Sequence, residues 1–509
     1  MRLYHMTRCH FGLLFIGFIA VFCISLIVGL IGPSVLLRQT TLASMLPNKP
    51  TDFRTGPFVL NPPPFSVFNQ ELWLSAFVKR ATFNEAAGLL IHFNVSLDIG
   101  VHPPITGQLV SGTNVDWNSS FVSLFPTKHY PVTLSCLKTI CDELVLAHLI
   151  PIDFTTYVFT IQFDGLTKSS SSTDQSPSLT DVYPNRLLDI RDIEFIFRYC
   201  NPRFTYLELI TRFVGLLVIE LVMVLFLGSL RRFAVRDWTI EQKVTAVLLP
   251  SLLLFNNPFY SLRYFTSGWF PQAMDYFFQI TFFCLLLLVW LCLYHGLRVT
   301  KRPFCRFYLP KLLILLVPWA VLVSLAAWKA RMEYTDVTFH SPFELNQIKY
   351  VGAFLIFFGA AYIIVFSIFL FRAFAELYSL SYYALRLKTL TSLSFLVTVV
   401  SVLTFVLRFK AELVLKGSAG TASSMFRSPD TSNAVAWSRS SAEITVSYAM
   451  LNAYLIALAV VYSPSKDAFV DSHFKDNPSV SMMNDSDDED GETVIYDSDA
   501  ETVQLTVRR

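Results

Sequence analysis

The fold class of this chain follows from the stretch FVGLLVIELVMVLFLGSL, residues Phe213 to Leu230. It is about 18 residues long, the length that an α-helix needs to cross the hydrocarbon core of a bilayer. Glu220 is its only charged side chain, so a helix built from it has no polar face to turn towards water. Burial in lipid is therefore predicted; the alternative, a large soluble all-α core, would need amphipathic stripes.

Six further apolar stretches of similar length follow the first. They are Val244 to Leu262, Tyr276 to Leu297, Leu312 to Trp328, Tyr350 to Phe371, Leu390 to Leu407 and Ile444 to Tyr462. Together the seven predict a receptor-like seven-helix transmembrane domain over residues 207–462. The composition, 53% hydrophobic and 15% charged, is typical of a multi-pass α-helical membrane protein.

An eighth apolar segment, Phe11 to Ile31, lies near the N-terminus behind Arg2 and Arg8. A cleaved signal peptide has an apolar core of about 7–15 residues, and this run is longer. Gly32-Pro33-Ser34 also lacks a clear small-x-small cleavage pattern. We therefore expect an uncleaved signal-anchor helix over residues 11–31. Residues 1–10 are expected in the cytoplasm, because positive charge remains on that side.

Residues 32–206 hold no stretch long enough to span a membrane, and their pattern changes to that of strands. Apolar and polar side chains alternate from Ile91 to Ile99, which is typical of a half-buried strand. The other candidates are Tyr157 to Phe163, Asp192 to Phe197, Val132 to Cys136 and Glu143 to Leu149. Because Pro, Gly and Asn separate these runs, an antiparallel β-sandwich is predicted, on the luminal or extracellular side.

Glycosylation and a disulfide are expected in the same segment. Asn94 and Asn118 begin Asn-x-Ser sequons, which predict N-glycosylation in a luminal domain. Cys136 and Cys141 lie close together in an oxidising compartment, so we expect them to form a disulfide. Cys200 is left over, either as a buried thiol or as an intermolecular link.

The basic residues of the connections favour cytoplasmic termini, although the last luminal loop, residues 408–441, departs from this bias. The tail, residues 463–509, contains dense acidic blocks and is predicted to be disordered. Ser486 and Ser498 are followed by acidic residues, a pattern that acid-directed kinases accept. The tail then serves either for solubility or as a sorting signal for cytoplasmic adaptors.

Several polar side chains fall at membrane depth and form a candidate intramembrane site. The set is Glu220, Asn256, Asn257, Asp275, Gln279 and Asn452. Glu220 is expected either to face the bundle interior, where Asn452 is a candidate partner, or to be protonated. Asp275 and Gln279 lie four residues apart on one helix face, and we expect them to share a layer with the two adjacent asparagines. The layer is either hydrogen-bonding glue between helices or a polar vestibule.

The sequence offers no support for catalysis or for nucleic-acid binding. It contains no Gly-x-Ser-x-Gly elbow and no Gly-rich phosphate loop. Only His295 lies near a span, whereas an intramembrane metal site needs several ligands. We therefore expect a non-enzymatic protein without a cofactor or metal. The basic residues adjoin membrane boundaries, so a nucleic-acid partner is not expected.

Several motifs resemble the transmembrane protein 181 family, which is Wntless-like. They are Arg236-Asp237-Trp238 through Gln242-Lys243, LLLVWLCLYHGLRV from Leu286 to Val299, Phe307 to Lys311, LNAYLIALAVVYSPSK from Leu451 to Lys466, and KDNPSVSMMNDSDDED from Lys475 to Asp490. The resemblance implies a luminal Golgi-dynamics-like β domain on a receptor-like bundle. It also implies cargo escort or ligand binding, with lipid-modified ligands and bacterial toxins as partners known in such proteins.

The leading hypothesis is a receptor or cargo-sorting protein of the Golgi and endosomal system and the plasma membrane. Its luminal domain binds a protein partner, and its bundle takes membrane lipid or an apolar moiety. One alternative is an orphan G-protein-coupled receptor, although the Asp-Arg-Tyr and Asn-Pro-x-x-Tyr motifs of rhodopsin-like receptors are missing at the expected places. The other is an ion channel or transporter that uses Glu220.

Overall fold

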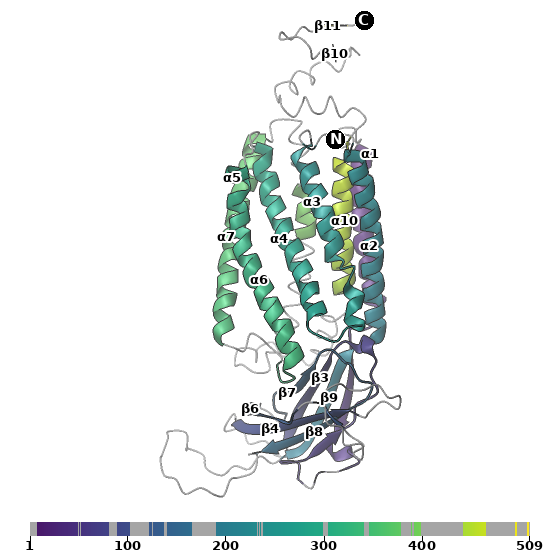
Figure 1. Cartoon of the computed structure of the whole chain (residues 1–509), viewed down its shortest axis with the longest axis vertical. Helices are drawn as coiled ribbons and strands as arrows, with labels where there is room; N and C mark the ends of the chain where they lie inside the picture. The colour runs from purple at the N-terminus through teal and green to yellow at the C-terminus, as the bar shows by residue number, and fades with distance from the viewer. Residues whose placement is uncertain are drawn as a thin grey trace.

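The computed structural model describes residues 8–48, 50, 52–80, 89–101, 122–124, 126–136, 140–164, 190–231, 233, 235, 238–298, 304–339, 346–377, 388, 391–398, 441–464, 494–495 and 506–507. Within these ranges the chain forms a β domain at one end of a long helical bundle (Figure 1). The beginning of α1 (Arg8–Ile31) and the end of α10 (Ala442–Tyr462) lie at the other end of the bundle. The predicted order of anchor helix, β domain and helical domain is therefore present.

The β domain is an antiparallel sandwich of two sheets. One sheet has the order β1 (Leu36–Leu42), β9 (Ile190–Cys200), β3 (Leu72–Arg80), β7 (Leu144–Leu149). The other has the order β2 (Phe58–Leu60), β8 (Tyr157–Asp164), β4 (Leu89–Val101), β5 (Val122–Ser123), and β6 (Lys128–Cys136) also pairs with β4. Aromatic rings from the two sheets meet in the core, where the centroids of Phe58 and Phe195 lie 5.3 Å apart.

The five predicted strands are confirmed as parts of β4, β6, β7, β8 and β9. In β4 the alternation holds from Phe93 to Val95, which are buried on either side of the exposed Asn94, but Ser96 on the predicted polar face is also buried. The sequence pattern does not predict β1, β2, β3 or the two-residue strand β5. β3 is paired on both edges, with β9 and β7, and its adjacent residues Ser75 and Ala76 are both buried. A strand covered on both faces loses the period-two signal.

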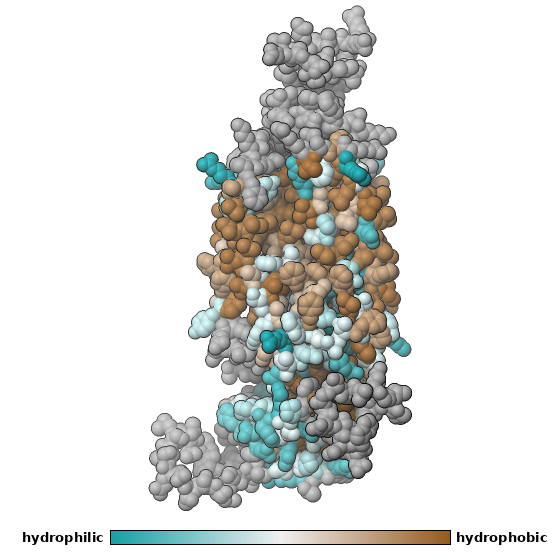
Figure 2. Space-filling model, viewed as in Figure 1, coloured by the Kyte–Doolittle hydropathy of each residue, from teal (hydrophilic) through white to brown (hydrophobic). Residues whose placement is uncertain are grey.

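Among the described residues, six helices are long and apolar enough to cross a membrane. They are α1, α2 (Pro202–Leu230), α4 (Phe270–Arg298), α6 (Leu309–Thr335), α7 (Asn346–Leu377) and α10. α5 (Phe304–Phe307) is one short turn before α6. Figure 2 shows an apolar belt over the helices and a more polar surface over the β domain. Residues 391–398 of the predicted span Leu390 to Leu407 are helical and the rest is not described, so the count of seven stays a prediction.

The predicted span Val244 to Leu262 is wrong as one continuous helix. α3 (Ile240–Phe255) begins with a capping box between Thr239 and Gln242 and ends before Asn257. Asn257 has a φ of 54°, in the left-handed region that asparagine tolerates better than most residues. Pro258 follows it, and a proline disfavours helical backbone at the preceding residue. The chain then continues as the 3₁₀ helix η4 (Tyr260–Tyr264).

The first and last helices of the bundle pack against each other closely. Ser441 Oγ donates a hydrogen bond to the carbonyl oxygen of Gly29 at 2.7 Å, and Thr445 Oγ1 donates to that of Ser25 at 3.2 Å. A Cβ atom on Gly29 would lie only 2.2 Å from the Cα of Ala442. Small and hydroxyl residues thus allow this approach, as is common between membrane helices. α1 is an integral part of the bundle.

The β domain contacts the bundle at two joints. At the first, Phe68 of the 3₁₀ helix η3 (Val67–Asn69) packs against Tyr206 of α2 and Tyr264 of η4, with ring centroids 4.7 and 5.3 Å apart. At the second, Val337, just after α6, is buried in the core of the β domain. Its carbonyl oxygen accepts a hydrogen bond from the backbone N–H of His148 in β7 at 2.7 Å. The β domain is therefore fixed to α2 and to α6.

In the tail, β10 (Val494–Ile495) pairs antiparallel with β11 (Thr506–Val507). Ser486 and Ser498, the predicted phosphorylation sites, lie outside the described residues, as does Asn118. The predicted disorder of the tail stays a prediction.

In the β domain, the short helix η2 (Ala43–Met45) follows β1. There Ser44 Oγ donates a hydrogen bond to Asp192 of β9 at 2.7 Å.

Candidate functional site

A buried arginine, Arg212 of α2, lies at the centre of a polar layer near the β-domain end of the bundle. Its Nη1 and Nη2 donate to the two carboxylate oxygens of Asp275 in α4, at 2.7 and 3.2 Å. Its Nε and Nη2 also donate to Glu208 Oε1, one turn earlier on α2, at 3.1 and 2.9 Å. The paired, two-point contact with Asp275 fixes the orientation of α2 relative to α4.

Two tyrosines enclose the guanidinium group of Arg212. Its central carbon lies 3.9 Å from the ring centroid of Tyr260 in η4 and 4.9 Å from that of Tyr448 in α10. Both distances fall within the range of a cation–π contact, which is strongest where water is excluded. The arginine thus connects four elements: α2, α4, η4 and α10.

Asp275 receives two further hydrogen bonds. Asn257 Nδ2 donates to Oδ1 at 2.8 Å, and Gln279 Nε2 donates to Oδ2 at 2.8 Å. Asn257 Oδ1 accepts from the backbone N–H of Phe259 at 3.1 Å, so the residue that ends α3 also holds the next turn in place. Asn257, Asp275 and Gln279 therefore lie together, in the layer that the sequence predicts.

Asn256 and Asn452 form a separate pair just beside this layer. Asn256 Nδ2 donates to Asn452 Oδ1 at 3.0 Å, and Asn452 Nδ2 donates back at 3.3 Å. Asn452 Nδ2 also reaches the carbonyl oxygen of Tyr448 at 2.7 Å. A Cβ atom on Gly215 of α2 would lie 3.1 Å from Asn256 Oδ1, so the glycine leaves room for the pair. The pair joins α3 to α10 beneath α2.

The prediction that Glu220 faces the bundle interior is wrong. Glu220 is exposed on α2, whereas its neighbour Ile219 is fully buried. The reason is the turn of 100° between successive helix residues, which lets only one of the two face inwards. Asn452 consequently pairs with Asn256 and not with Glu220.

The polar layer continues from α4 to α6. Gln272 Nε2 donates to Glu333 Oε2 at 3.0 Å, and Lys329 Nζ lies 3.5 Å from Glu333 Oε1. Gln272 and Glu333 are both buried. Glu333 lies in the last turn of α6, which ends at Thr335, two residues before Val337 of the second joint with the β domain.

Arg212 and Glu208 are the residues that the sequence reasoning missed. The predicted span began at Phe213, because a search for uncharged stretches stops at the first arginine. The missed signal is their spacing: an acidic and a basic residue four positions apart lie on one helix face and can neutralise each other. Because Glu208 and Arg212 neutralise each other, the membrane-spanning helix can continue through them towards its N-terminus, and α2 begins at Pro202.

A cavity of about 490 Å³ adjoins the layer at Asn257. Its wall is mostly apolar and is formed by the connection from α3 to α4. The lining residues are Asn257, Phe259, Leu262, Thr266, Ser267, Gly268, Trp269, Phe270, Pro271 and Met274. Phe259, Leu262 and Phe270 are also exposed at the surface.

The chemistry of the layer is that of paired, fixed charges. In the part of the chain that the structure describes, no three His, Cys, Asp or Glu side chains could share a metal ion. The arrangement therefore orients helices and holds charge at membrane depth. Removing one charged side chain of the layer leaves its buried partner without an opposite charge, which lowers the stability of the fold because the interior has a low dielectric constant.

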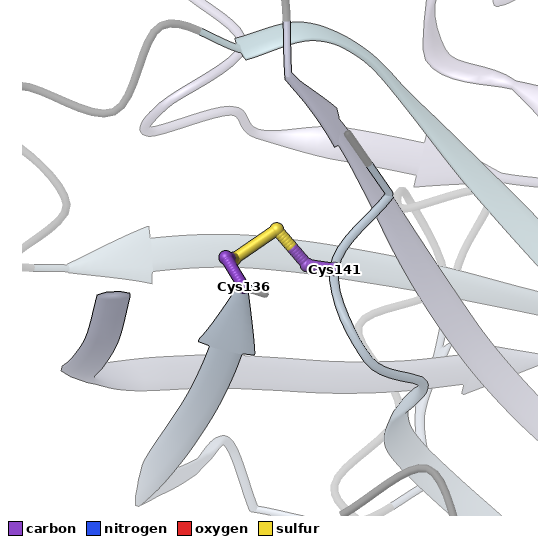
Figure 3. The surroundings of a disulfide bond; sticks show 2 residues. All are labelled: Cys136 and Cys141. Atoms are coloured by element: carbon purple, nitrogen blue, oxygen red, sulfur yellow. A yellow bond between two sulfur atoms is a disulfide. The ribbon is translucent and has the colours of Figure 1, made fainter. Parts of the chain in front are cut away.

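The remaining predicted sites lie in the β domain. Asn94 is exposed on β4, where a glycan has room. Cys136, at the end of β6, and Cys141, before β7, are joined by a disulfide (Figure 3). Cys200 is a buried free thiol 3.6 Å from Thr205 Oγ1. Burial raises the pKa of the Cys200 thiol to about 12.

Comparison with known proteins gives three findings. The family model described as the Wntless-like transmembrane domain matches residues 201–466. The model described as the TMEM181 GOLD domain matches residues 56–198. Human transmembrane protein 181 is 34% identical over 506 residues, which cover 99% of this chain and 95% of the human protein. The first matched region covers the helices from α2 to α10, and the second covers most of the β domain; α1 and β1 lie outside both.

Proposed function

This chain belongs to the transmembrane protein 181 family of Wntless-like multi-pass membrane proteins, and on that premise we propose that it is a receptor or cargo-sorting protein without enzymatic activity. Its β domain binds a luminal or extracellular protein partner, and its bundle responds to that binding. Both termini lie in the cytoplasm, and the protein works in the Golgi and endosomal system and at the plasma membrane.

The observation that carries the proposal is the path from the β domain to the polar layer. At the first joint Gln70 Nε2 donates to Thr205 Oγ1 of α2 at 3.0 Å and to the hydroxyl of Tyr264 at 3.2 Å. The ring of Tyr264 lies 6.0 Å from that of Tyr260, which covers Arg212. A partner that shifts the β domain thus acts on the group connecting four helical elements, which suits a receptor better than a passive anchor.

The cavity beside Asn257 supplies a second contact for such a partner. Its apolar wall suits membrane lipid or the apolar group of a lipid-modified ligand. A bacterial toxin is a further partner class, suggested by the family resemblance. The acidic tail then serves cytoplasmic sorting adaptors.

The test places a photo-crosslinking amino acid on the outer surface of the β domain. Gln162 is exposed on β8 and is the probe site; Val235 is exposed between α2 and α3, at the far end of the bundle, and is the matched control. We expect the Gln162 probe to capture a defined luminal or extracellular protein in living cells, and the Val235 probe not to capture it. Identical products from both sites would contradict the proposal.

The channel alternative loses the residue on which it was based, because Glu220 faces away from the bundle interior. A receptor that couples to G proteins is distinguished by measuring ligand-dependent nucleotide exchange in the same cells. Exchange that appears with the captured partner would make the protein a signalling receptor. Partner transport without exchange fits cargo sorting.

A further inference from the structure

The exposed carboxyl group of Glu220 lies in the middle of a membrane-spanning helix. At a rise of about 1.5 Å per residue, it is about 12 Å along α2 from Arg212 and about 16 Å from Arg231, the cap residue at the other end. A glutamate side chain is too short to reach water from that depth. A charged or unpaired carboxyl group facing lipid is unfavourable, so Glu220 needs a hydrogen-bonding partner.

The surroundings of Glu220 within the chain are apolar. Leu217, Leu221 and Val224, its neighbours on the helix surface, have exposed fractions of 49%, 60% and 60%. Among the described residues, none forms a hydrogen bond or an ion pair with Glu220. The partner therefore lies outside the described residues of this copy.

We propose that two copies of this chain associate in the membrane through α2, with the Glu220 carboxyl groups hydrogen-bonded to each other. A protonated carboxyl group is both a donor and an acceptor, so two identical groups satisfy one another. Identical chains insert with the same orientation, which places both Glu220 residues at the same depth. A two-fold axis along the membrane normal then brings the same α2 surface of each copy together.

The helix geometry defines which residues lie in this interface. At about 100° per residue, Val224 lies about 40° around α2 from Glu220, while Leu225 lies about 140° away. The two are almost equally exposed, at 60% and 64%. Val224 therefore belongs to the proposed interface and Leu225 faces lipid, which makes Leu225 a matched control.

The first experiment introduces single cysteines into the full chain and oxidises intact cell membranes. We expect Val224→Cys to give a disulfide-linked species of twice the chain mass, at least fivefold above Leu225→Cys and above the parent chain with its native cysteines. Equal crosslinking at the two positions would overturn the proposal. So would a product whose mass shows a different protein in place of a second copy.

The second experiment co-isolates two differently tagged copies from the same membranes. Glu220→Leu removes the hydrogen bond and should reduce co-isolation at least fivefold, while Glu220→Gln, whose amide is also both donor and acceptor, should retain at least half. Because Glu220 is outside the core, both variants should keep the thermal midpoint of the parent. Undiminished co-isolation of Glu220→Leu would refute the pairing.

Discussion

Replacing Arg212 with methionine tests the polar layer most directly. The change keeps a long side chain but removes the four hydrogen bonds that Arg212 donates to Glu208 and Asp275. Glu208 and Asp275 then lose the cation that they share, although Arg263 remains near Glu208. Breaking a buried ion pair by removing one partner costs about 3–5 kcal/mol. At about 2–4 °C per kcal/mol for a domain near this size, the thermal midpoint should fall by roughly 6–20 °C.

The assay heats the detergent-solubilised full chain at a fixed rate and measures the fraction that stays monodisperse on size-exclusion chromatography. Arg331→Met is the control, because Arg331 is exposed on α6. It should leave the midpoint unchanged within about 2 °C, since exposed charges contribute little.

A triple variant separates lost packing from uncompensated charge. Adding Glu208→Gln and Asp275→Asn to Arg212→Met removes both carboxylates together with the cation that they share, and should recover at least half of the lost stability. If Arg212→Met behaves like Arg331→Met, the layer does not hold the bundle together. If the triple variant is no more stable than the single one, the destabilisation comes from packing and the electrostatic reasoning is wrong.

Three further predictions concern other contacts. Gly29→Leu should prevent the close contact between α1 and α10 and lower the thermal midpoint in detergent. Gly12→Leu should not, because a Cβ atom on Gly12 has no atom within 4 Å. Burial alone would raise the pKa of the Asp336 carboxyl, but hydrogen bonds from Lys128 and Thr338 outweigh it and the pKa is lowered. The contribution of this pair is therefore present above the ordinary pKa of about 3.9 and is lost as the pH falls through the lowered value. The protection factor against amide hydrogen exchange at the second joint, which corrects for the pH dependence of exchange itself, should stay constant from pH 7 to 5 and fall in stronger acid. In Lys128→Met this factor should already be low at pH 7. Cys200, with its raised pKa, should resist iodoacetamide at pH 8 in folded protein and react after denaturation.

Hydropathy and alternation predict most of the fold, but hydropathy does not predict which face of an apolar helix turns towards the bundle interior. From Phe213 to Leu227, Glu220 is the only polar side chain of α2. The sequence of this part therefore does not show whether the face of Ile219 or that of Glu220 turns inwards. Only packing against the other helices separates them. The partner of Asn452 was predicted wrongly for the same reason.

Residues that combine two roles were the hardest to predict. Arg212 looks like the boundary of a span, yet it is neutralised inside the bundle by Glu208 and Asp275. Asn257 looks like part of a helix, yet it ends α3 and binds Asp275. Asp275 and Gln279 were placed correctly, because their spacing of four residues is a property of one helix and needs no knowledge of tertiary contacts.

The seam between Gly29 and Ser441 has a consequence for how the protein is made. The two residues are 412 positions apart, so the ribosome reaches the second long after the first has entered the membrane. At a synthesis rate of about 5–20 residues per second, roughly 20–80 s pass between the synthesis of Gly29 and that of Ser441. Until then the surface of α1 around Ser25 and Gly29 is not covered by α10. A chain that is truncated before α10 lacks the helix that covers this surface.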